Sequence, residues 1–359
     1  MSTSSRMLKI ALLVLLFCKP CVGAQRYRTE VIDGLGGGYA RARAVNSTGS
    51  IVGEAYIPSN VEHGFLHYGD YSYDLQTLGG QRSRMLDINS SGYAVGWAQD
   101  PVGNSKPVVW DGAGLSELAS LGGTSGSAWA INDHGVIVGN SYISQSVYHA
   151  TVWIDGAPID LGTLGGQYSI AYDVNSYGWI VGSAHNSSGC EWATLWTEDN
   201  PVVNLGGLPG STWSTARGVN DAGQVILWSD TYGGVSRAAL WQNNTVRDLG
   251  TLGGDDSWAY GLNNLGAVVG WAEMRAGNYH AFVYDGTSMV DLGTLGGMFS
   301  SAYGINDDGV IVGAAQNAAG RWEAVRWIPV PEPSGLCVLA IAACGTLAIM
   351  RRALRRPSH

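Results

Sequence analysis

The sequence predicts an all-β fold, a seven-bladed β-propeller made of four-stranded repeats of about 43 residues. The first observation is a Leu-Gly-Gly element that recurs through the 359-residue chain; its aligned leucines are Leu35, Leu78, Leu121, Leu164, Leu208, Leu252 and Leu295. Successive leucines are 43 or 44 residues apart. A fixed period in this range is typical of propellers, solenoids and arrays. Positions that all copies share therefore indicate architecture, and we expect a functional site where the copies differ.

The second observation is a hairpin turn in every repeat. Each turn begins at an asparagine and has a glycine three residues later, in the pairs Asn46/Gly49, Asn89/Gly92, Asn132/Gly135, Asn175/Gly178, Asn220/Gly223, Asn263/Gly266 and Asn306/Gly309. An asparagine side chain can cap such a turn, and glycine tolerates the positive φ that closes it. The residues that follow, such as Val310 to Gly313, are apolar at consecutive positions, which predicts a strand that is covered on both faces.

The third observation is how the repeat continues and how the chain ends. A third strand is expected at segments such as 149–153 and 280–284, and a fourth strand is expected to end in the Asp-Leu-Gly-Thr-Leu-Gly-Gly element. The seventh copy stops after Trp327 without a fourth strand, whereas residues 27–33 precede the first copy and resemble one. We therefore expect the N-terminal strand to complete the last blade, which closes the ring and removes exposed strand edges. An open β-solenoid is the alternative, but it needs capping units that the sequence does not show.

The first 24 residues predict a secretory signal peptide. Arg6 and Lys9 precede an apolar run from Ile10 to Phe17, and small residues stand before Gln25. The repeat domain is then expected over residues 25–329.

The C-terminal residues 330–359 form a tail with three parts. Pro331, Glu332 and Pro333 come first, an apolar segment over residues 336–350 follows, and four arginines stand at its end. The segment predicts a short transmembrane helix whose arginines stay on the cytoplasmic side. The tail resembles the PEP-CTERM sorting signal of exopolysaccharide-producing Gram-negative bacteria. The resemblance implies export, a transient inner-membrane tether, processing by an exosortase-type enzyme, and release to the cell surface or beyond; a plain membrane anchor is the alternative.

Charge and cysteine content limit the function further. Residues 25–333 carry 13 basic and 29 acidic side chains, a net charge of −16. An acidic surface repels phosphate backbones, so we expect no nucleic-acid partner. Cys190 is the one cysteine of this part of the chain, so it has no internal disulfide, and a packed or surface thiol is favoured over a reactive one.

The repeats resemble the HAF-repeat family of exported bacterial proteins. The family takes its name from a His-Ala-Phe sequence, which stands here at residues 280–282, and the resemblance covers nearly all of residues 27–328. It implies an exported, β-rich protein and little about chemistry.

No catalytic or metal-binding pattern stands out. His63, His149 and His280 occupy the same position in different repeats, so a ring keeps them apart, and a shared metal site is not expected. Asp74, Asp160, Asp248 and Asp291 likewise recur once per repeat, which favours a role in a turn over acid–base chemistry. The loops between strands also keep nearly constant lengths, whereas enzymes on repeat scaffolds usually carry an inserted loop. We expect a protein without enzymatic activity, cofactor or metal; a polysaccharide hydrolase or lyase is the alternative.

The variable stretches that link one blade to the next supply the candidate ligand-binding residues. These links and the connections between second and third strands lie on one face of a propeller, where their side chains surround the channel mouth. The candidates are Arg82, Arg84, Tyr168, Trp213, Asp255, Asp256 and Trp258, with Phe299 in the last link. Aromatic faces stack on sugar rings while charged groups bind the hydroxyls. The sequence thus favours a structural or interaction component of the exopolysaccharide layer, with glycan or a matrix protein as partner; packing between blades is the competing explanation for the tryptophans.

Overall fold

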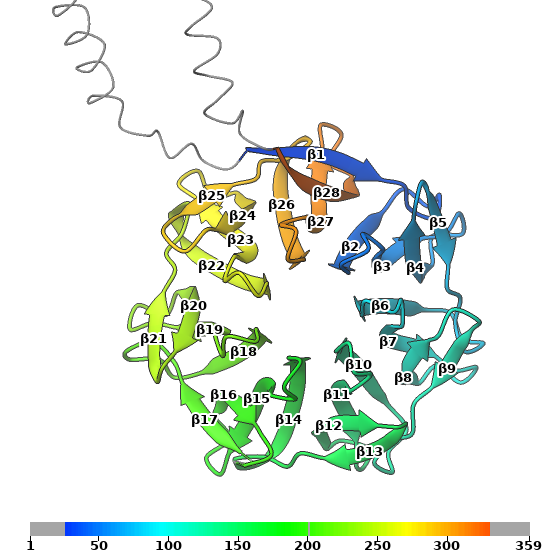
Figure 1. The fold of residues 1–359 in the computed structure, drawn as a ribbon, viewed down its shortest axis with the longest axis vertical. Coiled ribbons are helices and arrows are strands. Elements are labelled where there is room, and N and C mark those ends of the chain that lie inside the picture. The colour runs from blue at the N-terminus through cyan, green and yellow to red at the C-terminus, as the bar shows by residue number, and fades with distance from the viewer. Residues whose placement is uncertain (1–25, 200–201, 331–359) are drawn as a thin grey trace, which may run out of the picture. The chain divides into compact units, whose positions relative to one another are not determined.

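A computed structural model of the chain describes residues 26–199 and 202–330 and shows a closed ring of seven four-stranded antiparallel sheets (Figure 1). One compact unit spans Thr29–Ile328. No helix of the described residues is long and apolar enough to cross a membrane. The predicted signal peptide and most of the sorting tail, including Pro331, Glu332, Pro333 and the segment 336–350, lie outside the described residues.

Each sheet is one blade of the propeller, and the seventh blade takes its fourth strand from the N-terminus. Blade 1 contains β2 (Ala40–Val45), β3 (Ile51–Tyr56), β4 (Glu62–Tyr68) and β5 (Tyr71–Asp74); blade 2 contains β6 (Ser83–Ile88), β7 (Ala94–Gln99), β8 (Ser105–Trp110) and β9 (Leu115–Glu117); blade 3 contains β10 (Gly126–Ile131), β11 (Ile137–Tyr142), β12 (Tyr148–Ile154) and β13 (Ala157–Asp160); blade 4 contains β14 (Gly165–Val174), β15 (Ile180–Asn186), β16 (Glu191–Trp196) and β17 (Val203–Gly206). Blade 5 contains β18 (Ser214–Val219), β19 (Val225–Asp230), β20 (Ser236–Gln242) and β21 (Thr245–Asp248); blade 6 contains β22 (Gly253–Leu262), β23 (Val268–Met274), β24 (Tyr279–Tyr284) and β25 (Met289–Asp291); blade 7 contains β26 (Gly296–Ile305), β27 (Ile311–Asn317), β28 (Trp322–Val330) and β1 (Arg26–Ile32).

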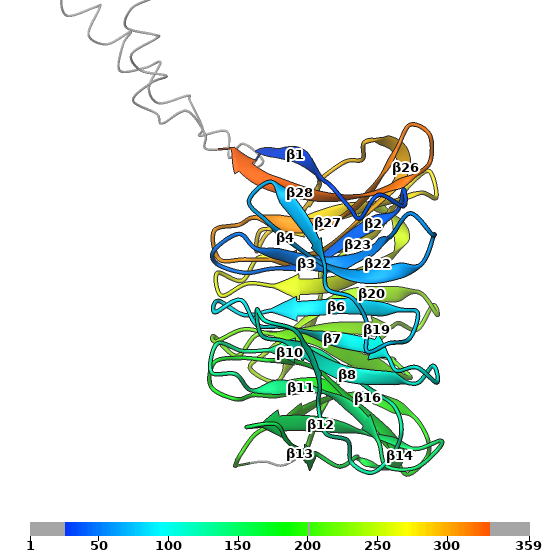
Figure 2. The ribbon, with the colours of Figure 1, turned by 90° about the vertical axis from the view of Figure 1, so that its right-hand side faces the viewer.

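The strand that precedes the asparagine turn is the innermost strand of every blade (Figure 1). Viewed from the side, the strands run between the two faces of the ring (Figure 2). The fourth strand is outermost and ends earlier than the sequence suggested, for example at Asp74 and Asp291. The glycine-rich element is therefore mainly the link to the next blade. The second glycine of this element has no room for a side chain, because the neighbouring backbone lies against it: a Cβ at Gly166 would lie 2.6 Å from the carbonyl oxygen of Asn186.

The ring closes through the N-terminal strand, as the sequence predicts. β1 pairs with β28 at the outer edge of blade 7, beside β27 and β26. An ion pair between Arg326 Nε and Glu30 Oε2, 2.7 Å apart, joins the two strands. Closure excludes the open solenoid.

The hydrophobic core lies between neighbouring blades. Ile226 and Leu240 of blade 5, for example, form one buried cluster with Ala259, Val268 and Phe282 of blade 6. An equivalent cluster joins blade 7 to blade 1. Trp153 and Trp327 are almost fully buried, and each Nε1 donates to a backbone carbonyl oxygen of the preceding blade. Packing between blades thus explains part of the tryptophan content.

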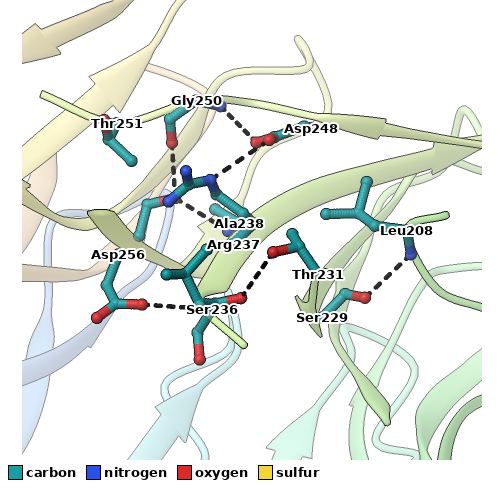
Figure 3. Close-up of polar contacts among 12 residues, drawn as sticks. Leu208, Ser229, Thr231, Ser236, Arg237, Ala238, Asp248, Gly250, Thr251 and Asp256 are labelled. Atoms are coloured by element: carbon teal, nitrogen blue, oxygen red, sulfur yellow. Dashed lines mark hydrogen bonds and ion pairs between the residues drawn. The ribbon is translucent and has the colours of Figure 1, made fainter. Parts of the chain in front are cut away.

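Serine side chains tie one blade to the next at the start of the inner strands. At the junction of blades 5 and 6, Ser257 Oγ accepts a hydrogen bond from the Ala238 amide at 3.0 Å and donates to the Gly250 carbonyl at 2.6 Å. The same junction contains the contact of Arg237 with Asp248 and the hydrogen bond from the Ser236 amide to Asp256 (Figure 3). The two-way serine bond recurs at Ser83, Ser169, Ser214 and Ser300.

The turn asparagines form a closed ring of hydrogen bonds around the channel. Each Oδ1 accepts the amide of the residue four positions later, which confirms the predicted cap. Each Nδ2 also donates to the backbone carbonyl of the next asparagine in the ring, at 2.9 to 3.3 Å. The last bond of the series runs from Asn306 to Asn46 and closes the ring.

We expect Asn175→Ala to lower the free energy of unfolding by about 1–3 kcal/mol, because the Tyr177 and Trp179 amides lose their shared acceptor and the Asn220 carbonyl loses one of its two hydrogen bonds. Urea unfolding followed by tryptophan fluorescence measures the change. Gln145→Ala, in an exposed loop, is the control and should stay within about 0.5 kcal/mol of the parent protein. An Asn175→Ala protein as stable as this control would contradict a structural role for the ring.

Candidate functional site

The links between blades and the connections from second to third strand lie on one face, which we call the link face; the asparagine turns lie on the other. The candidate residues belong to blades 2, 4, 5 and 6, and Figure 1 shows how these blades are arranged around the channel. Arg82 and Arg84 stand at the inner strand of blade 2, Tyr168 at that of blade 4, Trp213 just before that of blade 5, and Asp255, Asp256 and Trp258 on that of blade 6. The structure therefore brings together only part of the set.

Arg84 and Tyr168 are engaged in contacts with their surroundings. Arg84 Nη2 lies 2.9 Å from Glu62 Oε1 of blade 1, and its guanidinium also lies over the ring of Trp97. The ring centroids of Tyr168 and Tyr148 are 5.0 Å apart. Arg82 is exposed, and its amide donates to Gln99.

Trp213 and Trp258 lie next to each other and belong to a continuous line of half-buried rings. Trp213, Trp258, Trp271, Tyr279 and Phe299 follow one another from blade 5 to blade 7, with successive centroid distances of 6.1, 5.9, 4.8 and 4.6 Å. We call these five residues the aromatic line. Each side chain is only partly accessible to solvent.

Two aspartates adjoin this line on β22. The Asp255 side chain is exposed, and among the residues that the structure describes its carboxylate makes no hydrogen bond or ion pair. Asp256 Oδ1 instead accepts a bond from the Ser236 amide at 2.7 Å. The aromatic line thus has one carboxylate beside it that is free to accept hydrogen bonds from a ligand.

Trp258 contributes to packing between blades 5 and 6 as well as to the aromatic line. Its ring contacts Trp228 at 4.7 Å in addition to Trp213 and Trp271, and Trp228 bonds to the Ala259 carbonyl across the blade junction. Trp213 makes one ring contact, with Trp258. Replacing Trp213 therefore disturbs the scaffold less than replacing Trp258.

A second candidate site, which the sequence did not predict, lies inside the channel. Each inner strand has a register shift that leaves one extra residue three positions before the turn asparagine. A β-bulge of this kind re-aims a side chain. The seven extra residues all line one cavity of about 180 Å³: Arg43, Leu86, Trp129, Tyr172, Arg217, Tyr260 and Tyr303. The sequence does carry a signal for these residues: the position three residues before each constant asparagine varies among the repeats.

Two of these bulge residues are arginines in different environments. Arg43 makes two bonds to the fully buried Glu54, at 2.6 and 2.8 Å. Burial would lower the pKa of Arg43, but the adjacent Glu54 carboxylate outweighs this effect and raises it. Arg217 lies over aromatic rings instead, and burial lowers its pKa.

Two aspartates also face the cavity, beside the asparagine ring. Asp87 accepts hydrogen bonds from the Ile88 amide and, across the blade junction, from the Ile131 amide. Asp173 accepts the two corresponding hydrogen bonds, from the Val174 amide and, across the next blade junction, from the Val219 amide. Burial is the main cause that raises the pKa of Asp87 to about 7 and that of Asp173 to about 6, in spite of these bonds.

The recurrent histidines are held at the outer strands. His63, His149 and His280 each place Nδ1 within 3.0 Å of an aspartate carboxylate one strand away. The partners are Asp74, Asp160 and Asp291, which also accept the amide two residues later and so hold the turn, as expected. Among residues 26–199 and 202–330, no group of three or more His, Cys, Asp or Glu side chains could hold a metal ion.

No family model matches the chain, and no curated protein gives a significant match. Solved structures do resemble it. YCF48 bound to D1 peptide aligns with a TM-score of 0.50 and 13% identity, over 88% of this chain and 98% of that one. TolB from Acinetobacter baumannii aligns with a TM-score of 0.40 and 12% identity, over 79% of this chain and 64% of that one. The Aleuria aurantia lectin in complex with a fucosylated sugar aligns with a TM-score of 0.36 and 11% identity, over 86% and 100%. At such identities these likenesses concern the fold alone, and the chain is a seven-bladed β-propeller.

The channel aspartates predict a pH dependence of stability. Because the pKa of Asp87 is raised to about 7 on folding, the folded state binds more protons than the unfolded state between about pH 4 and 7. Stability should therefore be highest at the acidic end of this window and fall as the pH rises, by up to about 1.4 kcal/mol per pH unit for one proton.

We expect Asp87→Asn to remove this contribution to the pH dependence of the free energy of unfolding. Urea unfolding at several pH values measures the change. Asp308→Asn, at an exposed turn, is the matched control for loss of a carboxylate. If the free energy of unfolding changed with pH in the same way for Asp87→Asn and for the parent protein, Asp87 would not be the source of the pH dependence.

Proposed function

We propose that this protein is an exported, non-enzymatic propeller that binds polysaccharide of the extracellular layer through the aromatic line on its link face. The observation that carries the proposal is the uninterrupted run of five half-buried rings across three blades. Export and delivery to the cell surface rest on the predicted signal peptide and on the resemblance of the C-terminal tail to a sorting signal.

The chemistry of the line suits sugar rings. Partly exposed aromatic faces give a pyranose a flat apolar surface, and polar groups nearby fix its orientation. Asp255 offers a carboxylate without a partner among the described residues. Asn278, next to Tyr279 in the chain, has its amide nitrogen in contact with the Met298 carbonyl at 3.1 Å and with His280 Nε2 at 3.0 Å, so its amide oxygen is the group that can accept a bond from a sugar hydroxyl. A chain of sugars laid along the line would meet several rings in succession, so affinity would accumulate from weak, repeated contacts.

The polar groups near the line support binding rather than hydrolysis. Other carboxylates near the line accept backbone amides: Asp230 accepts those of Thr212 and Trp213, and Asp256 accepts that of Ser236. Glu273 accepts the amides of Asp255 and Asp256 at 2.7 and 3.3 Å. Its role is to hold the backbone of β22. We therefore propose binding without cleavage, and the alternative of a hydrolase or lyase is tested in the same experiment.

Purified protein should bind the exopolysaccharide of its host saturably in calorimetry, and Trp213→Ala should weaken this binding at least about tenfold, because one ring of the line is lost. Trp213→Phe keeps an aromatic face and should retain most of the affinity. Tyr177→Ala is the matched control, since Tyr177 is an aromatic residue that is 73% exposed on the opposite, asparagine-turn face.

Two results would overturn the proposal. Equal binding by Trp213→Ala and the parent protein, with both folded by circular dichroism, would remove the aromatic line as the site. A fall in polysaccharide chain length after incubation with the protein would establish an enzyme instead.

A further inference from the structure

We propose that the channel contains a second binding site, in which Arg217 binds the carboxylate of a small sugar acid such as a uronic acid. This site lies on the bulge residues of the inner strands rather than on the link face. It goes beyond the proposed function, and it can be tested without the polysaccharide.

The position of Arg217 follows from its strand. The register shift between Ala216 and Gly218 makes it the extra residue of β18 and directs its side chain to the cavity. Its guanidinium carbon lies 3.8 Å from the centroid of the Tyr172 ring and 4.2 Å from that of Trp228. These cation–π contacts and a side-chain hydrogen bond to Tyr172 hold the guanidinium in place, while its Nε donor has no partner among the described residues.

No carboxylate of the described residues pairs directly with the Arg217 guanidinium, although its charge reaches Asp173, where it lowers a pKa that burial raises. In the part of the chain that the structure describes, Arg217 forms no ion pair, and its buried Nε makes no hydrogen bond. Arg43, the arginine at the same position in blade 1, pairs with Glu54, eleven residues later. In blade 5 the residue eleven positions after Arg217 is Trp228, which stacks on the cation and cannot neutralise it.

A buried guanidinium without a counter-charge is costly, and a ligand that supplies the charge recovers this cost on binding. Carboxylates match the fork of arginine donors with two parallel hydrogen bonds. The cavity therefore offers an anion a buried guanidinium that has an unpartnered Nε and no direct ion pair within the described residues.

The rest of the cavity selects a small, hydroxylated ligand. Its volume of about 180 Å³ is below the range of about 300–1,000 Å³ that is usual for drug-sized molecules. Trp129, Tyr172, Tyr260 and Tyr303 line it, and burial raises the pKa of Tyr172 and Tyr260, so these hydroxyl groups stay protonated. Aromatic surface, hydroxyl donors and carboxylate acceptors at Asp87 and Asp173 suit the hydroxyl groups of one sugar unit.

The test is calorimetric titration of the purified full-length chain with sodium glucuronate, with glucose, and with inorganic phosphate. We expect saturable binding of glucuronate, no heat with glucose, and weaker binding of phosphate. Arg217→Gln should weaken glucuronate binding at least about tenfold, because both charged hydrogen bonds are lost. Arg217→Lys keeps the charge without the fork and should be intermediate.

Arg247→Gln is the matched control, because it removes the same charge from an exposed position on the outer strand β21. Trp213→Ala should leave glucuronate binding unchanged, which separates this site from the aromatic line. The parent protein's preference for glucuronate over glucose needs no variant, so it tests the site even if Arg217→Gln does not fold.

Absence of saturable glucuronate binding at concentrations well above the millimolar range would overturn the proposal. Equal affinity in folded Arg217→Gln and the parent protein would do the same for the role of Arg217. Equal binding of phosphate and glucuronate would assign the cavity to small anions in general and reject a sugar-acid site.

Discussion

The ring of seven asparagines is the constraint on which the rest of this propeller depends. Each side chain uses its oxygen to cap its own turn and its nitrogen to hold the next blade, so neither group is free for another role. Because every asparagine bonds to the same atom of the next, the inner strands must end at the same height around the channel. Most intervals between successive asparagines are 43 residues, which meets this condition directly. The interval from Asn175 to Asn220 is 45 residues, and it meets the condition by placing one added residue before Leu208 and one after it.

The asparagine ring also determines which position of each blade can carry a different side chain without disturbing the fold. The bulge lies three residues before each asparagine, so all seven bulge residues reach the same level of the channel. Backbone bonds keep that position constant, while the side chain is free to differ from one blade to the next. A repeat protein that must keep its blades alike can thus change the chemistry of its channel without changing the asparagine bonds that join the blades.

More of the fold than of the candidate site could be predicted from the sequence. The repeat period predicted seven blades, and the missing strand after Trp327 predicted closure by the N-terminus, because both are patterns along the chain. The bond from Asn306 to Asn46 spans 260 residues and appears only when the ring closes. The bulges have no residue signature, so Arg43 and Arg217 were not predicted as channel residues. Among the predicted site residues, Trp213 and Trp258 do meet, but Arg84 is bound to Glu62, a partner in another blade that the sequence does not reveal.

The comparison of blade 1 with blade 5 shows how a repeat scaffold can produce a binding group. Both blades place an arginine at the bulge, and in both the side chain meets the residue eleven positions later on the neighbouring strand. With Glu54 at that position the cation is neutralised inside the blade, and with Trp228 it is oriented but not neutralised. The same geometry recurs where Trp129 Nε1 bonds to Asn140 at 3.2 Å. One residue of the second strand therefore decides whether the channel side chain beside it has a partner of opposite charge, and in blade 5 it is a tryptophan that gives the arginine none.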